Sequence, residues 1–317
     1  AIDYASEIQK AGGTYTGAHL LLNLEKTNDS ALQSMLSRFG AQIVGLPAEF
    51  AVYLATGAAK REVTGYTQYV TRTIATTGNL APAGQYAVVR IDPEAGGISY
   101  VPTTLRTVGS TTEADFQRRG NSTYALVRRS AQYSDMTSHW ARGSVNLLTS
   151  KFIADGPSDT RFDPEKPITR ADFAKFIARG LGLTGNRSAA ARFSDVNTSN
   201  AASAYIGAVS AANIVQGGTD GRFRPTASIT REEMATIMVR AMNYVGVSAT
   251  SSSSALTPFS DRSKVSSWAR SGVAACVQAG IISGVTATTL KPQDPATRAQ
   301  AAVIVQRFLE YVGMLQR

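Results

Sequence analysis

The amino-acid sequence predicts a multidomain chain, in which an α+β domain over residues 1–130 precedes an all-α, pseudo-threefold bundle of three repeats over residues 131–317. Two observations predict this division. A set of landmarks returns three times in the second half, and the first half alternates short strand-like segments with one helical stretch. With 317 residues, 43% of them hydrophobic, the chain is long enough for two or three packed domains.

The first half reads as strands rich in β-branched and aromatic residues around one amphipathic helix. The helix is predicted over Asp29–Phe39, where Leu32, Met35, Leu36 and Phe39 share a face. Turns are expected at Gly96-Gly97 and Gly120-Asn121. The predicted strands are Leu20–Leu24, Phe50–Leu54, Tyr66–Ile74, Tyr86–Ile91, Ile98–Val101 and Tyr124–Val127. The chain opens on Ala1-Ile2-Asp3 without a secretory signal, so we interpret it as a fragment of a larger protein whose first domain is truncated at its amino end.

Three landmarks recur together in the second half, at steps of 61 and then 67 residues. The first is a glycine after an apolar helix end, at Gly156, Gly217 and Gly284. The second is Phe162-Asp163-Pro164, Phe223-Arg224-Pro225 and Leu290-Lys291-Pro292. The third is Ile168-Thr169-Arg170-Ala171-Asp172, Ile229-Thr230-Arg231-Glu232-Glu233 and Ala296-Thr297-Arg298-Ala299-Gln300. Shared steps for all three landmarks indicate true repeats, at about residues 133–183, 193–246 and 259–313.

The pattern within each repeat predicts a first helix, a loop and a second helix. The glycine is expected to end the first helix in a left-handed conformation. The threonine is expected to cap the second, with a capping box in repeats two and three and an aspartate variant in repeat one. Because one helix pair cannot cover its own apolar face, the three should pack together. Residues 184–191 and 248–255 are predicted to be exposed linkers.

The arginine after each capping threonine is the most informative residue. Arg170, Arg231 and Arg298 fall at the first helical position, where the helix dipole disfavours a cation. One interpretation is an ion pair with Asp135, Asp195 or Asp261, and another is an anion pocket formed with free backbone N–H groups. Trp140 and Trp268 open the first helix of repeats one and three, where each could belong to the core or form a platform for a sugar ring, while Ala201 stands in repeat two.

Composition excludes several classes of function. The lone Cys276 and the separated His19 and His139 indicate no disulfide, metal site or cofactor. No apolar run is long enough to cross a bilayer, and no catalytic motif is present, so the chain is expected to be soluble and not an enzyme. Residues 131–317 carry a net charge of +7 against +2 for residues 1–130, which favours an anionic partner. The basic residues are dispersed among acids, which argues against nucleic acid.

Residues 133 to 313 resemble three tandem S-layer homology modules, through Phe193-Ser194-Asp195-Val196 and its partners, His139-Trp140-Ala141 and the landmarks above. The resemblance implies an extracellular module that anchors a larger protein to the bacterial cell wall. Its grooves would bind an anionic secondary cell-wall polysaccharide, commonly pyruvylated, with the threonine-arginine motif contacting the pyruvate carboxylate. It implies these candidate binding residues: Arg170, Arg231, Arg298, Trp140, Trp268, Gly156, Gly217, Gly284, Asp135, Asp195 and Asp261.

Departures from the family pattern at Ala201 and Ala296 predict unequal grooves, at least one of them silent. The first domain resembles the α+β module that precedes such repeats in cell-surface proteins, through residues 69–74, 100–104 and 121–124. Two alternatives stay open for the whole protein. It is the end of a secreted glycosidase or other surface enzyme with an upstream catalytic domain, or it is a structural subunit of an S-layer lattice.

Overall fold

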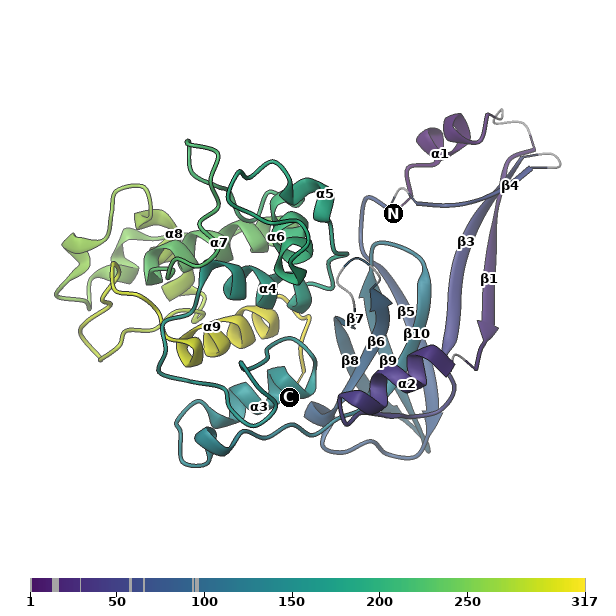
Figure 1. Cartoon of the computed structure of the whole chain (residues 1–317), viewed down its shortest axis with the longest axis horizontal. Helices are drawn as coiled ribbons and strands as arrows, with labels where there is room; N and C mark the ends of the chain where they lie inside the picture. Colours follow the sequence, from purple (N-terminus) through teal and green to yellow (C-terminus); the bar gives the residue numbers. More distant parts are fainter. Residues whose placement is uncertain are drawn as a thin grey trace. The chain divides into compact units, whose positions relative to one another are not determined.

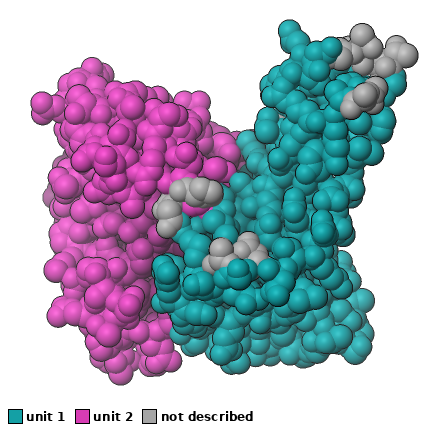
Figure 2. Space-filling model, turned by 45° about the vertical axis from the view of Figure 1, so that its right-hand side comes forward, with its two compact units in different colours: residues 1–91, 97–130, 316–317 teal, residues 92–96, 131–315 magenta. Residues whose placement is uncertain are grey.

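The computed structural model describes residues 2–12, 17–28, 30–56, 59–64, 66–92, 94 and 97–316. It divides into two compact units, one formed by residues 1–91, 97–130 and 316–317 and the other by residues 92–96 and 131–315 (Figure 2). Ala1, Asp29 and Gly96, which entered the predictions above, lie outside the described residues.

The first unit is built on two antiparallel sheets. The larger has the strand order β1-β3-β10-β6-β7 (Figure 1). In addition, β2 pairs with β10 and β4 pairs with β3. The smaller has the order β5-β9-β8. The strands of the larger sheet are β1 (His19–Lys26), β2 (Gln42–Ile43), β3 (Ala48–Thr56), β4 (Ala59–Glu62), β6 (Tyr86–Asp92), β7 (Gly97–Val101) and β10 (Ser122–Arg128). Those of the smaller are β5 (Val70–Thr77), β8 (Thr103–Val108) and β9 (Thr111–Arg118).

Aromatic side chains join the two sheets in one core. Phe50 of β3, Phe116 of β9 and Tyr124 of β10 meet at ring-centroid distances of 4.7 to 5.8 Å. Ile74 and Val88 belong to the same buried cluster. Two helices, α1 (Tyr4–Lys10) and α2 (Ser30–Arg38), and the short 3-10 helix η1 (Ala83–Gln85) complete the described part of this unit.

The predicted fold class is therefore wrong for the first domain, which is a β-sheet unit and not an α+β one. The prediction omitted the whole β8–β9 hairpin. Along β9 the buried positions alternate strictly, but they hold Thr112, Ala114, Phe116 and Arg118, of which only Phe116 is a large apolar side chain. Small and polar residues at buried positions conceal the alternation that predicts a strand.

The second unit is helical, and each repeat contributes one pair of α-helices. The pairs are α3 (Arg142–Ser150) with α4 (Arg170–Gly180), α6 (Ala201–Ala211) with α7 (Arg231–Tyr244), and α8 (Arg270–Gln278) with α9 (Arg298–Tyr311). The 3-10 helices are η2 (Ser134–Met136), η3 (Ser253–Leu256) and η4 (Arg262–Lys264). The second helix of each pair contacts the first helix of the next repeat, as α4 with α6, α7 with α8 and α9 with α3.

Three backbone hydrogen bonds close a ring through the three repeats. The amide of Ile168 donates to the carbonyl of Ala296 at 2.9 Å, that of Ile229 to Ile168 at 3.2 Å, and that of Ala296 to Ile229 at 3.0 Å. The backbone of Ile168, Ile229 and Ala296 therefore accepts a hydrogen bond from one neighbouring repeat and donates one to the other. The contacts have cyclic threefold order although the helices differ in length.

The second helix of each repeat begins directly after the predicted threonine, whereas the first helix does not end at the predicted glycine. Thr230 and Thr297 form complete capping boxes, and the Thr169 side chain accepts from the Asp172 amide. The left-handed residue after each first helix is Phe152, Asn213 or Gly280, with φ of 59°, 57° and 69°. The predicted glycines stand four residues further on, so their role is a different one.

The predicted linkers are not plain exposed loops. Residues 187–190 form the short helix α5 (Arg187–Ala190), which packs on α6. The contact is close at Gly207, where an added Cβ would lie 1.7 Å from the carbonyl oxygen of Asn186. Residues 253–256 form η3, which packs on α8.

Candidate functional site

Asp135, Asp195 and Asp261 hold the loop that precedes each second helix. In repeat two the Asp195 carboxylate accepts from the amides of Phe223 and Arg224, each at 2.8 Å. Asp135 and Asp261 do the same in repeats one and three. Burial raises the pKa of Asp195 and Asp261, but the backbone amide donors outweigh it and leave both pKa values low. These carboxylates are loop anchors, not the ion-pair partners of the arginines.

The arginine of each threonine-arginine motif forms hydrogen bonds with the next repeat around the ring. Arg231 donates through Nε to the Leu290 carbonyl at 2.7 Å, through one terminal nitrogen to the Ser283 carbonyl at 2.7 Å, and through the other to Oε1 of Gln300. Arg170 and Arg298 make the same set with repeats two and one. Their acidic partners are Glu233 at 3.4 Å and Asp172 at 3.0 Å. The sequence did not reveal these partners, because they come from the neighbouring repeat.

These arginines are mostly buried. Arg231 and Arg298 are 7% exposed, and the side chain of Arg170 is 15% exposed. Burial lowers the pKa of Arg170 and of Arg231. All three nitrogens of each guanidinium form hydrogen bonds, mainly to carbonyl oxygens of the next repeat. These bonds compensate for the repulsion between the cation and the positive end of the helix dipole.

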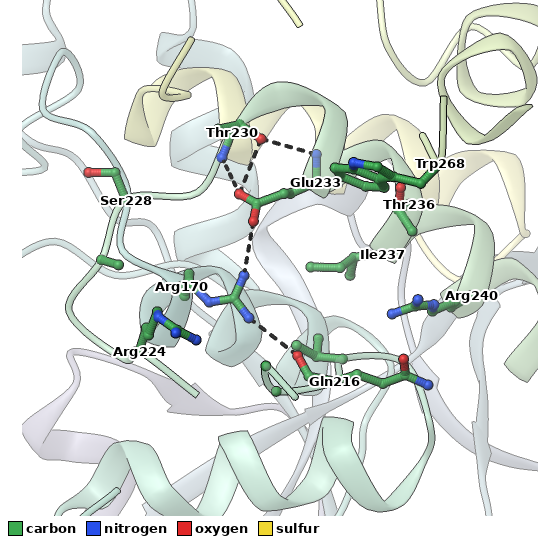
Figure 3. A pocket seen from close by; sticks show the side chains of 14 residues that line it. Arg170, Gln216, Arg224, Ser228, Thr230, Glu233, Thr236, Ile237, Arg240 and Trp268 are labelled. Atoms are coloured by element: carbon green, nitrogen blue, oxygen red, sulfur yellow. Dashed lines mark hydrogen bonds and ion pairs between the residues drawn. The ribbon is translucent and has the colours of Figure 1, made fainter. Parts of the chain in front are cut away.

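A groove of about 590 Å³ lies beside Arg170. Figure 3 shows the Arg170 guanidinium between Glu233 and Gln216, with Arg240 and Trp268 on the other side of the groove. The wall combines residues of all three repeats, since Trp268 belongs to repeat three and Arg240 to repeat two. It carries three cations and one acid: Arg170, Arg224, Arg240 and Glu233.

A second groove of about 370 Å³ lies beside Arg231 and repeats the same plan one step further round the ring. Trp140 takes the place of Trp268, Arg307 that of Arg240, and Gln300 that of Glu233. Both grooves therefore pair an indole ring with an arginine that is the tenth residue of the second helix. That second arginine was not singled out from the sequence, although Arg179, Arg240 and Arg307 recur at the same steps as the other landmarks.

Both tryptophans lie at the surface, with Trp140 65% exposed and Trp268 57% exposed. A core position, one of the two interpretations of the sequence, is therefore wrong for both. Each ring therefore leaves a large apolar face open to solvent at the edge of a cationic groove. His139 lies next to Trp140, with ring centroids 5.5 Å apart, and its Nε2 pairs with Glu165 at 2.7 Å.

Gly156, Gly217 and Gly284 are required for close approach and not for a left-handed backbone. Their φ angles are not positive. A Cβ on Gly156 would lie 1.9 Å from the Arg161 carbonyl oxygen, and one on Gly217 would lie 2.5 Å from the ring of Phe193. The glycines let the loop close over the first helix end, and Gly217 and Gly284 also line the two grooves.

Within the described residues, no group of three or more histidine, cysteine, aspartate and glutamate side chains could hold a metal ion. Cys276 is buried, and burial raises the pKa of its thiol to about 12. Its Sγ donates to the Ala235 carbonyl at 3.4 Å. The helices of the described chain are too short or too polar to span a membrane.

Fold and site together define a helical repeat module with ligand-sized, cationic, aromatic-edged grooves between its repeats. The S-layer homology domain family matches residues 132–174, 192–235 and 258–302. Residues 132–302 therefore carry three tandem S-layer homology domains. Domains of this kind are non-catalytic modules that anchor extracellular proteins to the cell wall, so the predicted localisation at the bacterial cell surface is confirmed.

Relatives match over the repeats. An amylopullulanase from Thermoanaerobacterium thermosulfurigenes is 36% identical over 61% of this chain and 10% of its own length. A surface-layer 125 kDa protein from Lysinibacillus sphaericus is 31% identical over 59% of this chain and 16% of its own. A cellulosome-anchoring protein from Acetivibrio thermocellus is 32% identical over 47% of this chain and 33% of its own. The chain thus spans a tenth to a third of the length of these relatives.

Proposed function

We propose that residues 131–317 anchor the protein to the cell wall by binding an anionic, pyruvylated secondary cell-wall polysaccharide in the grooves beside Arg170 and Arg231. The observation that carries this proposal is the pairing, twice over, of an exposed indole with a groove arginine: Trp268 with Arg240, and Trp140 with Arg307. An indole face stacks on a sugar ring while a guanidinium binds a carboxylate, so each pair suits an acidic sugar.

The candidate residues take different parts in this proposal. Arg170 and Arg231 contribute fixed positive charge at the groove floor, and Gly217 and Gly284 contribute backbone that a sugar can approach closely. Asp135, Asp195 and Asp261 position the loops. The net charge of +7 on residues 131–317 would draw an acidic polymer toward the module at long range.

The test measures binding of the whole chain to purified wall polysaccharide, before and after mild acid hydrolysis of its pyruvate ketals. Trp140→Ala and Trp268→Ala together should weaken binding by at least about tenfold, as truncation of a tryptophan at the centre of a binding site does. Tyr311→Ala, which removes another exposed aromatic ring, is the matched control. Equal binding to native and depyruvylated polymer would refute the ligand, and equal binding by the double variant would refute the site.

For the whole protein we propose a surface protein in which residues 1–130 form a separate domain without catalytic activity and three repeats, at about 133–183, 193–246 and 259–313, provide the anchor. Further domains of the same protein would carry either a glycosidase activity or lattice contacts of an S-layer. Resemblance to an amylopullulanase and to a surface-layer protein supports each choice equally. Hydrolysis of soluble glucans by the full-length protein, and lattice formation on wall fragments, would separate the two.

A further inference from the structure

The third position in the ring, beside Arg298, differs from the two grooves in its charges. Here the Asp155 carboxylate pairs with Lys175 at 2.7 Å and with Arg179 at 2.8 Å. Lys175 also pairs with Asp172 at 3.2 Å, and Asp172 pairs with Arg298 at 3.0 Å. Three cations and two carboxylates therefore satisfy one another within the protein.

The equivalent positions in the two grooves hold no such carboxylate. Gln216 and Ser283 stand where Asp155 stands, and Thr236 and Val303 stand where Lys175 stands. Arg307 donates to the Ser283 hydroxyl at 3.1 Å. Arg240 has no ion pair within the described ranges and faces the groove (Figure 3).

The Asp155 carboxylate is held in a fixed charge field. Arg179 is fixed by a bond from its Nε to the Tyr205 hydroxyl at 3.1 Å, and its guanidinium lies over the Tyr205 ring. Burial raises the pKa of Asp155, but Arg179 and Lys175 outweigh it and bring that pKa down to about 2. The carboxylate is thus ionised at neutral pH, and an incoming anion would have to displace it from two cations at once.

The same position also lacks the aromatic edge. By the cyclic order, the residue that corresponds to Trp268 and Trp140 here is Ala201 of repeat two. The position beside Arg298 therefore has an internal carboxylate and no indole ring. The two grooves have an indole ring and no such carboxylate.

We propose that Asp155 occupies the anion-binding position of the third groove, so that this chain binds a carboxylate-bearing sugar in two grooves and Asp155 determines that number. The proposal rests on the proposed function, because it takes the ligand to be an acidic sugar. It adds the residue that closes one groove and the chemistry by which it does so, a side-chain carboxylate in place of the ligand carboxylate.

The test is calorimetric titration of the whole chain with a methyl glycoside that carries a pyruvate ketal, with its methyl ester as the uncharged probe. The parent chain should bind two molecules of the acid and none of the ester. Asp155→Ser, which installs the residue of repeat three, should raise the stoichiometry from two to three. Combining it with Ala201→Trp should tighten the added site. Asp159→Ser, an exposed change of the same charge in the same loop, should leave two sites.

The outcomes separate the two proposals. No binding of the acid by the parent chain would overturn the proposed ligand and this inference with it. Two sites in both the parent and a folded Asp155→Ser variant, or three sites in the parent, would overturn this inference alone. If Asp155→Ser does not fold, a crystal of the parent chain soaked with the probe decides. Density beside Trp140 and Trp268 with none beside Asp155 supports the inference, and density at all three refutes it.

Discussion

Each second helix of the repeats carries two arginines, and the two sets behave differently. The inner set, Arg170, Arg231 and Arg298, begins the helix and is buried against the carbonyls of the next repeat. The outer set, Arg179, Arg240 and Arg307, lies nine residues later and is only partly buried. The inner arginines bond to residues at equivalent positions in all three repeats. Among the outer arginines, Arg179 pairs with Asp155, Arg307 donates to Ser283, and Arg240 has no ion pair in the described part of the chain.

This difference teaches which arginine is free to vary in function. A guanidinium that ties two repeats together cannot leave its carbonyl partners without a cost in folding. One at the groove rim can bind an internal acid, as Arg179 does, or a hydroxyl, as Arg307 does, or remain available, as Arg240 does. The charges around the three positions thus differ although the ring that supports them is regular.

The largest expected effect is on stability, from Arg298→Ala. Breaking a largely buried, hydrogen-bonded ion pair costs about 3 kcal/mol of unfolding free energy, near the lower end for such pairs because Asp172 keeps its contact with Lys175. Urea unfolding followed by far-UV circular dichroism at the helical band measures it, since the α-helical signal comes mainly from the second unit. Arg270→Ala, an exposed change of the same charge, should change the free energy little.

A loss of unfolding free energy below about 1 kcal/mol, the range of an exposed ion pair, would contradict this prediction. It would show that the ring of inner arginines does not hold the repeats together.

How much of the second unit could be predicted follows from its repetition. The helix pairs, the capping threonines and the arginine at each helix start all follow from the recurring residues Thr169, Thr230 and Thr297. Partners across repeats could not be predicted, because the sequence does not state which repeat follows which around the ring. The reason for Gly156 was also missed, since close approach and a left-handed turn both select glycine.

The first unit was predicted less well because its buried positions are not marked by hydrophobic residues. Strands with large apolar residues, such as β3 and β6, could be predicted near their observed places. In β9 the buried Arg118 and Thr112 donate to the backbone carbonyls of Asn121 and Gly78. A polar residue that is buried with its partners satisfied looks, in the sequence, the same as one in solvent.

A smaller effect is expected on binding, from Arg240→Ala. Loss of one hydrogen bond from a charged group costs about 1.5 to 3 kcal/mol, so affinity for the pyruvylated polymer should fall about tenfold or more at the groove beside Arg170. The free energy of unfolding should not change, because Arg240 has no ion pair in the described part of the chain. Binding is compared with Arg270→Ala, which removes the same charge from an exposed residue that lines neither groove. Equal affinity of the two variants would exclude Arg240 from the site.

The smallest effect is on acid stability, and it tests how firmly Arg179 is held by its internal acid. Because the folded-state pKa of Asp155 is about 2 and its ordinary value is 3.8, its contribution to stability is complete above that ordinary value and is lost as the pH falls from about 4 toward 2. The contribution is about 1 kcal/mol, since the Asp155 side chain is 40% exposed and its ion pairs are screened.

Unfolding free energies of the parent chain and of Asp155→Ser, measured between pH 7 and pH 2.5, should therefore differ by about 1 kcal/mol at neutral pH and converge below pH 4. Asp159→Ser, which removes an exposed carboxylate from the same loop, is the control and should change the unfolding free energy little. If the difference in unfolding free energy between the parent chain and Asp155→Ser stays constant down to pH 2.5, Asp155 stabilises the loop by packing and not by its charge. Arg179 would then be available to a ligand, as Arg240 is, and the contrast among the outer arginines would disappear.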